Sequence, residues 1–99
     1  MVELGSLVEK VRSKNAGPFW LTIDIFCGNR AAFNRVSALQ SSRVAALLGV
    51  GEAQLKRFDI ADLNVVKFSV PRPVVQGISA DRDMHGAGWA CLLEELELD

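Results

Sequence analysis

The stretch F-W-L-T-I-D-I-F-C, residues 19–27, has the clearest period of the whole chain. Every second residue from Phe19 to Cys27 is apolar, and the residues between them are of mixed polarity. This alternation predicts a β-strand, because successive side chains of a strand point to opposite faces. Both faces carry large apolar side chains, so we expect a central strand that is covered on both sides. Asp24 is an unusual residue for such a strand.

The segment before this strand predicts a short helix. Ser6-Leu7-Val8-Glu9 fits a capping box, and Leu7, Val8 and Val11 form an apolar stripe, so we expect a helix from about Leu7 to Ser13. Asn15 and Gly17 suit the exit of that helix, and Pro18 prevents its continuation.

Two further helices are expected after the strand. Asn29 can cap a helix from Arg30 to about Leu39. Ser41 and Ser42 offer the cap of the next helix, which Gly49 and Gly51 close. The residues expected to point inward are Phe33, Val36 and Leu39 in the first helix, and Val44, Leu47 and Leu48 in the second.

The rest of the chain predicts more strands. We expect a strand at Lys56–Ile60 with Phe58 and Ile60 inward, and a clearer one at Val65–Val70 that Pro71 and Pro73 end. A glycine-rich loop follows over residues 76–88. Residues 91–98 are ambiguous, and the alternation of leucine with acidic residues at their end favours a strand over a helix.

These elements predict one α+β domain over residues 1–99, with about three helices on one side of a mainly antiparallel sheet of about four strands. The hydrophobic fraction of 49% and the charged fraction of 23% are typical of globular proteins. No apolar run reaches the roughly 18 residues of a membrane span, and the N-terminus lacks a secretory signal. We therefore expect a cytoplasmic protein that does not bind membranes.

The net charge of −1 conceals an asymmetry. Residues 1–80 hold ten Lys/Arg and six Asp/Glu, whereas residues 81–99 hold one Arg and six acids. The scattered cations and the lack of interleaved aromatic residues argue against nucleic-acid binding. We expect the acidic tail to lie along the basic body or along a partner.

Cys27 and Cys91 each lie beside an apolar run and form no zinc-binding pattern. We expect both to be buried free thiols.

Two segments are candidate anion sites. R-S-K-N-A-G-P-F, residues 12–19, places Arg12, Lys14 and Asn15 before the strand, where they suit either a turn or a carboxylate or phosphate site. Pro71-Arg72-Pro73 holds an arginine on a stiff backbone, which suits either a blocked sheet edge or a carboxylate clamp.

The segment Asp81-Arg82-Asp83-Met84-His85 is a candidate for proton transfer or metal binding. A calcium loop is excluded, because Leu92 stands where the bidentate glutamate would be. His85 beside Asp81 and Asp83 could act as a general acid or base, although the segment is more typical of a solvated polar loop. We expect no metal and no other cofactor.

The octapeptide and the V-P-R-P-V-V segment at residues 70–75 resemble a small bacterial family, a domain of unknown function of the DUF4387 type. Its members accompany, or are fused to, acyclic terpene utilisation (AtuA-like) proteins. The resemblance covers nearly the whole chain, and His85 lies outside the pattern, which argues against a catalytic role for it. The matching residues are Arg12, Ser13, Lys14, Asn15, Ala16, Gly17, Pro18, Phe19, Pro71, Arg72, Pro73, Gly77, Asp81, Asp83 and Gly86.

The resemblance implies an accessory or binding subunit that acts with an AtuA-like protein on an organic acid or an acyl-CoA. A stand-alone lyase or isomerase is the alternative, with a cationic clamp and Asp24, Asp83 or His85 moving a proton. A purely structural oligomerisation domain is a third.

Two geometric expectations follow. Trp20 and Phe26 share the mixed face of the strongest strand, which predicts a homo- or hetero-oligomer through that sheet. Arg12, Lys14 and Arg72 are expected to cluster beside Asn15, with Asp81 and Asp83 as counter-charges.

Overall fold

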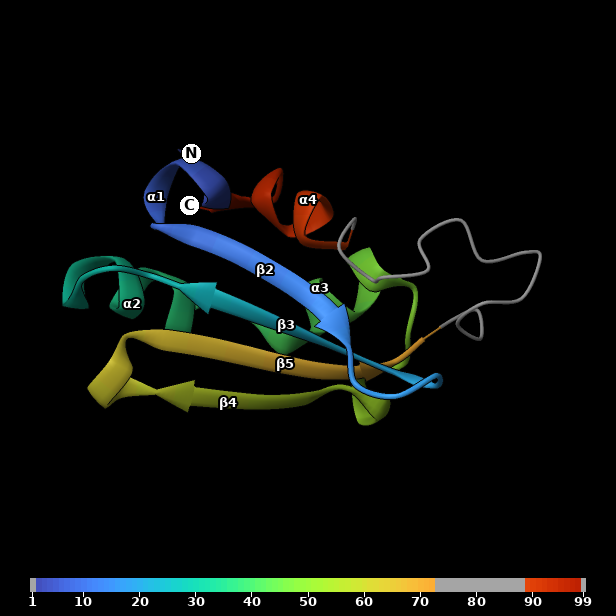
Figure 1. Ribbon diagram of the computed structural model, residues 1–99. Coiled ribbons are helices and arrows are strands. Elements are labelled where there is room, and N and C mark those ends of the chain that lie inside the picture. Colours follow the sequence, from blue (N-terminus) through green and yellow to red (C-terminus); the bar gives the residue numbers. More distant parts are fainter. Residues whose placement is uncertain (1, 73–88, 99) are drawn as a thin grey trace.

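The computed structural model describes residues 2–72 and 89–98 and has the predicted α+β architecture (Figure 1). Four antiparallel strands form the main sheet in the order β2-β3-β5-β4, and a small sheet pairs β1 with β6. The elements are β1 (Val2–Glu3), α1 (Leu4–Leu7), β2 (Lys10–Asn15), β3 (Trp20–Phe26), α2 (Arg30–Ser37), α3 (Ser41–Leu48), the 3₁₀ turn η1 (Glu52–Gln54), β4 (Lys56–Ile60), the 3₁₀ turn η2 (Ala61–Leu63), β5 (Val65–Pro71), α4 (Trp89–Glu94) and β6 (Glu97–Leu98).

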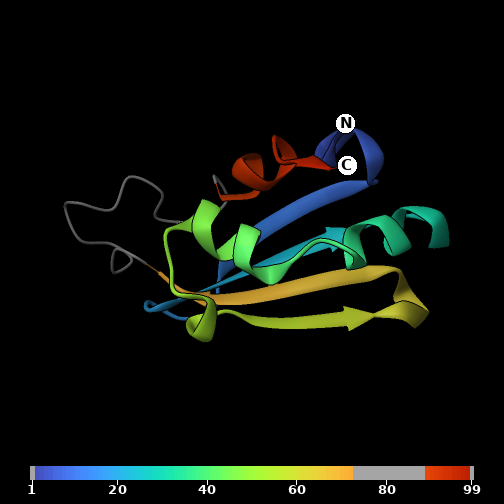
Figure 2. The ribbon, with the colours of Figure 1, turned by 180° about the vertical axis from the view of Figure 1, so that it is seen from behind.

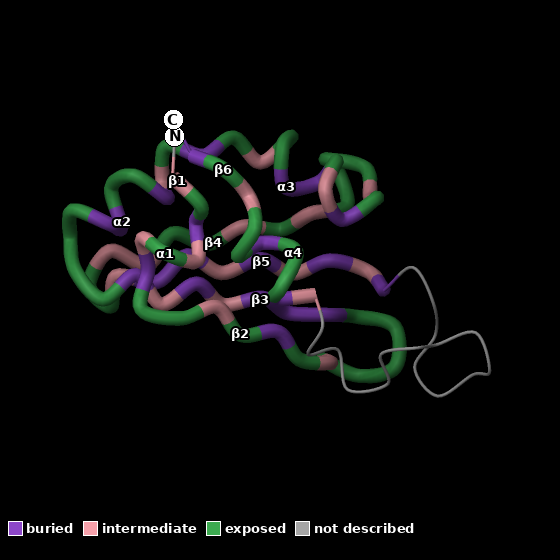
Figure 3. Tube along the Cα trace, turned by 90° about the horizontal axis from the view of Figure 1, so that it is seen from above, coloured by how far each residue is buried: buried purple, intermediate pink, exposed green. Residues whose placement is uncertain are grey.

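The helices lie on one side of the main sheet, as expected. Seen from behind, α2 and α3 lie in front of the strands (Figure 2), and α4 packs beside them against β2. One continuous apolar core fills the space between the two layers, and Leu93 of α4 and Leu98 of β6 belong to it. The two termini lie side by side where β1 pairs with β6 (Figure 3).

The central position of the predicted strand is confirmed, but the expectation that it is covered on both sides is wrong for the described residues, because the helices lie on one side of the sheet (Figure 2). Strand β3 pairs with β2 on one side and with β5 on the other, and Leu21, Ile23 and Ile25 are at most 1% exposed. Phe19 lies outside the strand and is 60% exposed.

The expected helix over residues 7–13 is wrong. Helix α1 is a single turn that ends at Leu7, and residues 10–15 form the edge strand β2. The segment K-V-R-S-K-N alternates a cation with a smaller residue, which is the period of a strand. Gly17 has a positive φ of +82°, but it turns a β2–β3 hairpin and does not end a helix as expected.

Helices α2 and α3 form where they were predicted. Asn29 caps α2 by accepting a hydrogen bond from the Ala32 amide (2.8 Å), and Gly49 closes α3 with a φ of +73°. The expected serine cap of α3 is absent, because Gln40 occupies the cap position without a side-chain bond.

Strand β4 has the predicted bounds but the opposite orientation. Phe58 is 50% exposed, so the expectation that Phe58 and Ile60 point inward is wrong. Arg57 takes the inward position, with its guanidinium 5.7 Å from the ring centre of the buried Phe68. This orientation follows from what Arg57 binds.

Arg57 ties strand β4 to the connection between α2 and α3. Its Nη2 donates to the Ser37 carbonyl (2.8 Å), and its Nη1 donates to the Leu39 carbonyl and to the Ser41 hydroxyl (3.2 Å). Its Nε donates to Asp59 at 2.8 Å. The Ser37 carbonyl is the last of α2, and the Leu39 carbonyl lies just beyond the helix, so the guanidinium satisfies groups that have no donor from the helix and would be costly to bury alone.

The expected strand over residues 91–98 is largely wrong. Helix α4 runs to Glu94, and only Glu97 and Leu98 are in a strand. Ala90 and Leu93 are buried three residues apart, which is helical spacing, whereas the alternation of leucine with acids holds only for the last few residues. None of the helices in residues 2–72 and 89–98 is long and apolar enough to cross a bilayer.

The two cysteines differ, which corrects the expectation that both are buried. Cys27 is 1% exposed, whereas Cys91 lies on the exposed side of α4. Burial raises the pKa of the Cys27 thiol above its ordinary value of 9.0, and the negative charge of Asp59 raises it further. Because the folded pKa is raised, the neutral thiol contributes stability below about pH 9 that is lost as the pH rises through the folded value.

Replacing Arg57 with alanine should lower the free energy of unfolding by about 2–4 kcal/mol, because buried carbonyls lose a charged donor. Arg57→Lys should recover only part of this loss, since one ammonium cannot reach all of the acceptors. Urea unfolding measures both changes. Arg12→Ala, on the exposed side of β2, is the control and should stay within about 0.5 kcal/mol of wild type. An equal effect of Arg57→Ala and Arg12→Ala would contradict the role of Arg57.

In the folded protein at pH 8, Ellman's reagent should label Cys91 quickly and Cys27 only after unfolding, because the thiolate is the reactive form. The Cys91→Ser variant should therefore show almost no rapid labelling. Rapid reaction of one thiol in that variant would show that Cys27 is accessible and ionised.

Candidate functional site

The side of the main sheet that faces away from α2, α3 and α4 carries no covering element among the described residues (Figure 1). We call it the open face. Because side chains alternate along each strand, the strand register assigns its members. They are Lys10, Arg12 and Lys14 of β2; Trp20, Thr22, Asp24 and Phe26 of β3; Val65, Lys67, Ser69 and Pro71 of β5; and Lys56, Phe58 and Ile60 of β4.

The open face exposes aromatic side chains. Trp20 is 38% exposed and Phe58 is 50% exposed. The ammonium groups of Lys56 and Lys10 lie 5.4 Å and 5.0 Å from the ring centres of Trp20 and Phe26, within cation–π range. The face therefore combines apolar area with positive charge.

The open face also contains a buried polar atom without a partner. Thr22 is 9% exposed, and its hydroxyl oxygen has no hydrogen-bond partner among the described residues. It lies in a cross-strand row between Lys14 of β2 and Ser69 of β5. A buried hydroxyl that bonds to nothing is costly, so this is a position where a further donor or acceptor would stabilise the protein.

The register divides the expected cation cluster between the two sides of the sheet. Arg12 and Lys14 project from β2 onto the open face. Arg72 follows Pro71 and lies on the helix side, where it is 9% exposed and its Nη1 donates to the Asn15 side-chain oxygen. The structure thus brings Asn15 and Arg72 together, and the expectation that Arg12 and Lys14 join them is wrong. That expectation treated the two cations as helical, whereas a strand sends residues 12 and 15 to opposite faces.

Arg72 and Asn15 lie near a second polar contact that the sequence did not suggest. The Ser13 hydroxyl, also on the helix side of β2, accepts a hydrogen bond from the Ala90 amide at 2.9 Å. This bond fixes the first turn of α4 against the strand, and the Arg72 amide donates to the Phe19 carbonyl at 2.8 Å. The strand period of residues 10–15 is the signal that would have placed Ser13 and Asn15 on one side.

The other sequence candidates are placed only in part. Asp24 lies on the open face between Arg12 and Lys67 in the register, so it does not face Arg72. Asp81, Asp83 and His85 lie outside the described residues. Within residues 2–72 and 89–98, no group of three or more His, Cys, Asp or Glu residues could hold a metal ion.

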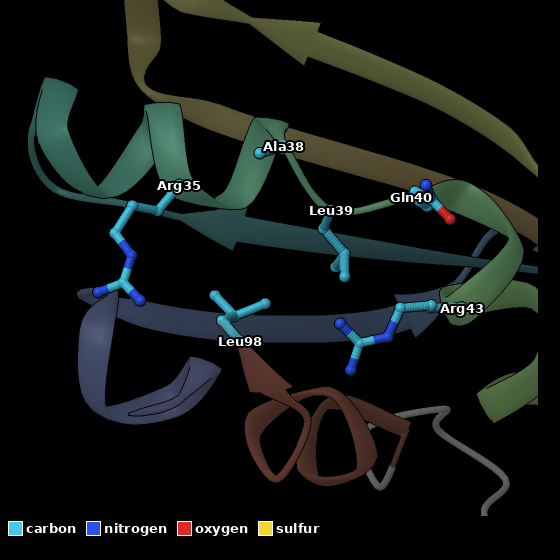
Figure 4. Close-up of a pocket in the computed structure, with 6 residues that line it drawn as sticks. All are labelled: Arg35, Ala38, Leu39, Gln40, Arg43 and Leu98. Carbon is cyan, nitrogen blue, oxygen red and sulfur yellow. The ribbon is translucent and has the colours of Figure 1, made fainter. Parts of the chain in front are cut away.

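A cavity of about 310 Å³ lies at the connection between α2 and α3 (Figure 4). The guanidinium groups of Arg35 and Arg43 flank Leu98 there, and Leu39 lies on the opposite wall. Arg43 donates to the Glu97 carbonyl at 2.8 Å, which ties α3 to β6. The charge of Arg43 thus lies within a contact between the helix layer and the C-terminal strand.

The acidic residues of the described C-terminal segment lie away from the open face. Glu94 and Glu95 share a hollow of about 450 Å³ with Glu3, at the contact between α1 and α4. Of the acidic tail, β6 lies along the body beside Arg35 and Arg43, whereas Glu94 and Glu95 lie away from the cations of the open face.

The model of a protein family described as "Domain of unknown function (DUF4387)" matches residues 4–97. No curated protein and no solved structure matches the chain.

The contact between Arg72 and Asn15 can be tested with a double-mutant cycle. Arg72→Ala should cost about 2 kcal/mol of unfolding free energy, because it removes a charged donor from a part-buried acceptor. Asn15→Ala should cost less, and the coupling between the two changes should be about 1 kcal/mol. Thermal or urea unfolding of the two single variants and the double variant gives this value. Additive effects would mean that the two side chains stabilise the protein independently.

Proposed function

The chain belongs to the DUF4387 family, and we propose that it is an accessory subunit that acts with an AtuA-like protein on an organic acid or an acyl-CoA thioester. The open face carries this proposal. Antiparallel sheets with one solvated face normally alternate core residues with polar ones. Here the outer face holds Trp20, Phe26 and Phe58, which is the composition of a surface that another protein covers.

Two features of the open face support a protein partner. Covering the exposed parts of Trp20 and Phe58 would contribute about 1 kcal/mol for each side chain from apolar burial alone. The ammonium groups of Lys56 and Lys10 lie beside Trp20 and Phe26 on the same face, so a partner can also meet positive charge next to the apolar area. The identity of the partner rests on the resemblance to proteins that accompany or are fused to AtuA-like proteins.

The acid-binding part of the proposal now rests on Arg72 and Asn15. Arg72 is held on the helix side by its contact with Asn15, and a positioned guanidinium is well suited to a carboxylate. Arg12 and Lys14 belong to the docking surface and not to this site. A stand-alone lyase or isomerase would need a proton-moving group beside the clamp. Asp24 lies on the other face of the sheet, and the other two candidates, Asp83 and His85, lie outside the described residues.

Co-expression of the chain with a neighbouring AtuA-like protein should give a stable complex in size-exclusion chromatography with light scattering. Trp20→Ser and Phe58→Ser should each weaken it about tenfold, because exposed aromatic anchors dominate binding energies. Leu63→Ser is the control, since Leu63 is 68% exposed but lies in the turn η2. The proposal would be refuted if the two proteins elute separately and the activity of the AtuA-like protein is the same with and without this chain.

A further inference from the structure

The lysines of this chain are not spread over its surface. The sequence contains four, Lys10, Lys14, Lys56 and Lys67, and the strand register places every one on the open face. Arg12 adds a fifth cation. Asp24 is the one carboxylate that the register assigns to this face.

The cations of the open face are not neutralised within the described residues. The salt bridge found there joins Arg57 to Asp59, and it lies on the helix side of the sheet. Asp24 stands opposite Arg12 on one side and Lys67 on the other, without an ion pair to either in the described part of the chain. Five cations around one carboxylate therefore give the open face a positive electrostatic potential, which an acidic surface would complement.

This charge pattern disfavours a second copy of the chain as the occupant. A two-fold dimer would set the same patch against itself, so two surfaces of the same net positive charge would meet across the interface. Like charges brought together in this way oppose association.

Single-stranded nucleic acid fits the pattern less well than an acidic protein. Base stacking needs several open aromatic faces in a row, but an ammonium group lies 5.4 Å from the ring centre of Trp20 and 5.0 Å from that of Phe26, which leaves less ring surface for bases. A phosphate backbone carries a negative charge at every nucleotide and would therefore also face Asp24, whereas a protein surface can place an uncharged group opposite it.

We infer that the open face binds a partner surface that is acidic and apolar at once, with carboxylates meeting the cations of β2 and β5 and apolar side chains meeting Trp20 and Phe58. This inference rests on the proposed function for the identity of the partner, and it adds the chemistry by which the partner is recognised. Because exposed ion pairs are screened by salt, the interaction must weaken as the ionic strength rises.

The experiment measures the dissociation constant for the AtuA-like protein at about 50 and about 500 mM NaCl, a range over which screening becomes strong. Wild type should bind about tenfold more weakly at the higher salt concentration than at the lower one. At the lower concentration, the Arg12→Glu/Lys14→Glu variant should already bind about tenfold more weakly than wild type. The control is Ala31→Glu/Asn34→Glu/Ser42→Glu/Ala46→Glu, which makes the same change of four units in net charge on exposed residues of α2 and α3. This control should bind like wild type, and circular dichroism and melting curves verify that both variants are folded.

Equal weakening by the Arg12→Glu/Lys14→Glu variant and by the control variant would overturn the inference in favour of diffuse electrostatics. A dissociation constant that changes neither with the salt concentration nor in either variant would also overturn the inference, but it would leave the proposed function intact. A second arm uses labelled probes, a peptide of about ten residues that alternates glutamate with leucine and an oligothymidylate of similar length. The peptide should bind wild type and not Arg12→Glu/Lys14→Glu.

The probes separate the two proposals. If the AtuA-like protein does not bind but the peptide does, the proposed function is wrong and the acidic partner class stands. If neither binds, the inference is wrong. Tighter binding of the oligothymidylate than of the peptide would assign the face to nucleic acid, and a wild-type dimer that Trp20→Ser dissociates would assign it to a second copy.

Discussion

The inward position of Arg57 determines both layers of this domain. Its guanidinium binds the carbonyls at the end of α2 and the Ser41 hydroxyl at the start of α3, so it joins the helix layer to the edge of the sheet. Because neighbouring residues of a strand point in opposite directions, Lys56 and Phe58 must then point outward. The contact that holds the helices in place therefore also places Lys56 and Phe58 on the open face.

Much of the fold could be predicted because several segments have one strong local signal. The alternation in residues 19–27 gave β3, and the cap at Asn29 and the glycine at position 49 gave α2 and α3. Strand β2 was missed because its residues carry two signals. The capping pattern at Ser6 competed with the strand period of residues 10–15, and pairing with β3 decided between them.

The candidate site was harder to predict than the fold, because it depends on which face each residue takes. Misreading β2 as a helix grouped Arg12 and Lys14 with Arg72, whereas the strand register separates them. For β4, apolarity alone favoured an inward Phe58. The sequence around Lys56–Ile60 does not show that carbonyl groups near the end of α2 accept hydrogen bonds from the inner side of β4. This contact between distant segments of the chain turns Arg57 inward and Phe58 outward.

The concentration of lysines on one side has a consequence for the chemistry of the surface. Every side-chain amine of the chain projects from the open face, whereas the cations described elsewhere are guanidinium groups. Acylation removes the charge of lysine but leaves arginine unchanged. An acylating agent or enzyme would therefore neutralise most of one face and leave the helix side electrostatically intact. Amine coupling to a solid support would likewise fix the molecule through that face and present the helices to solvent.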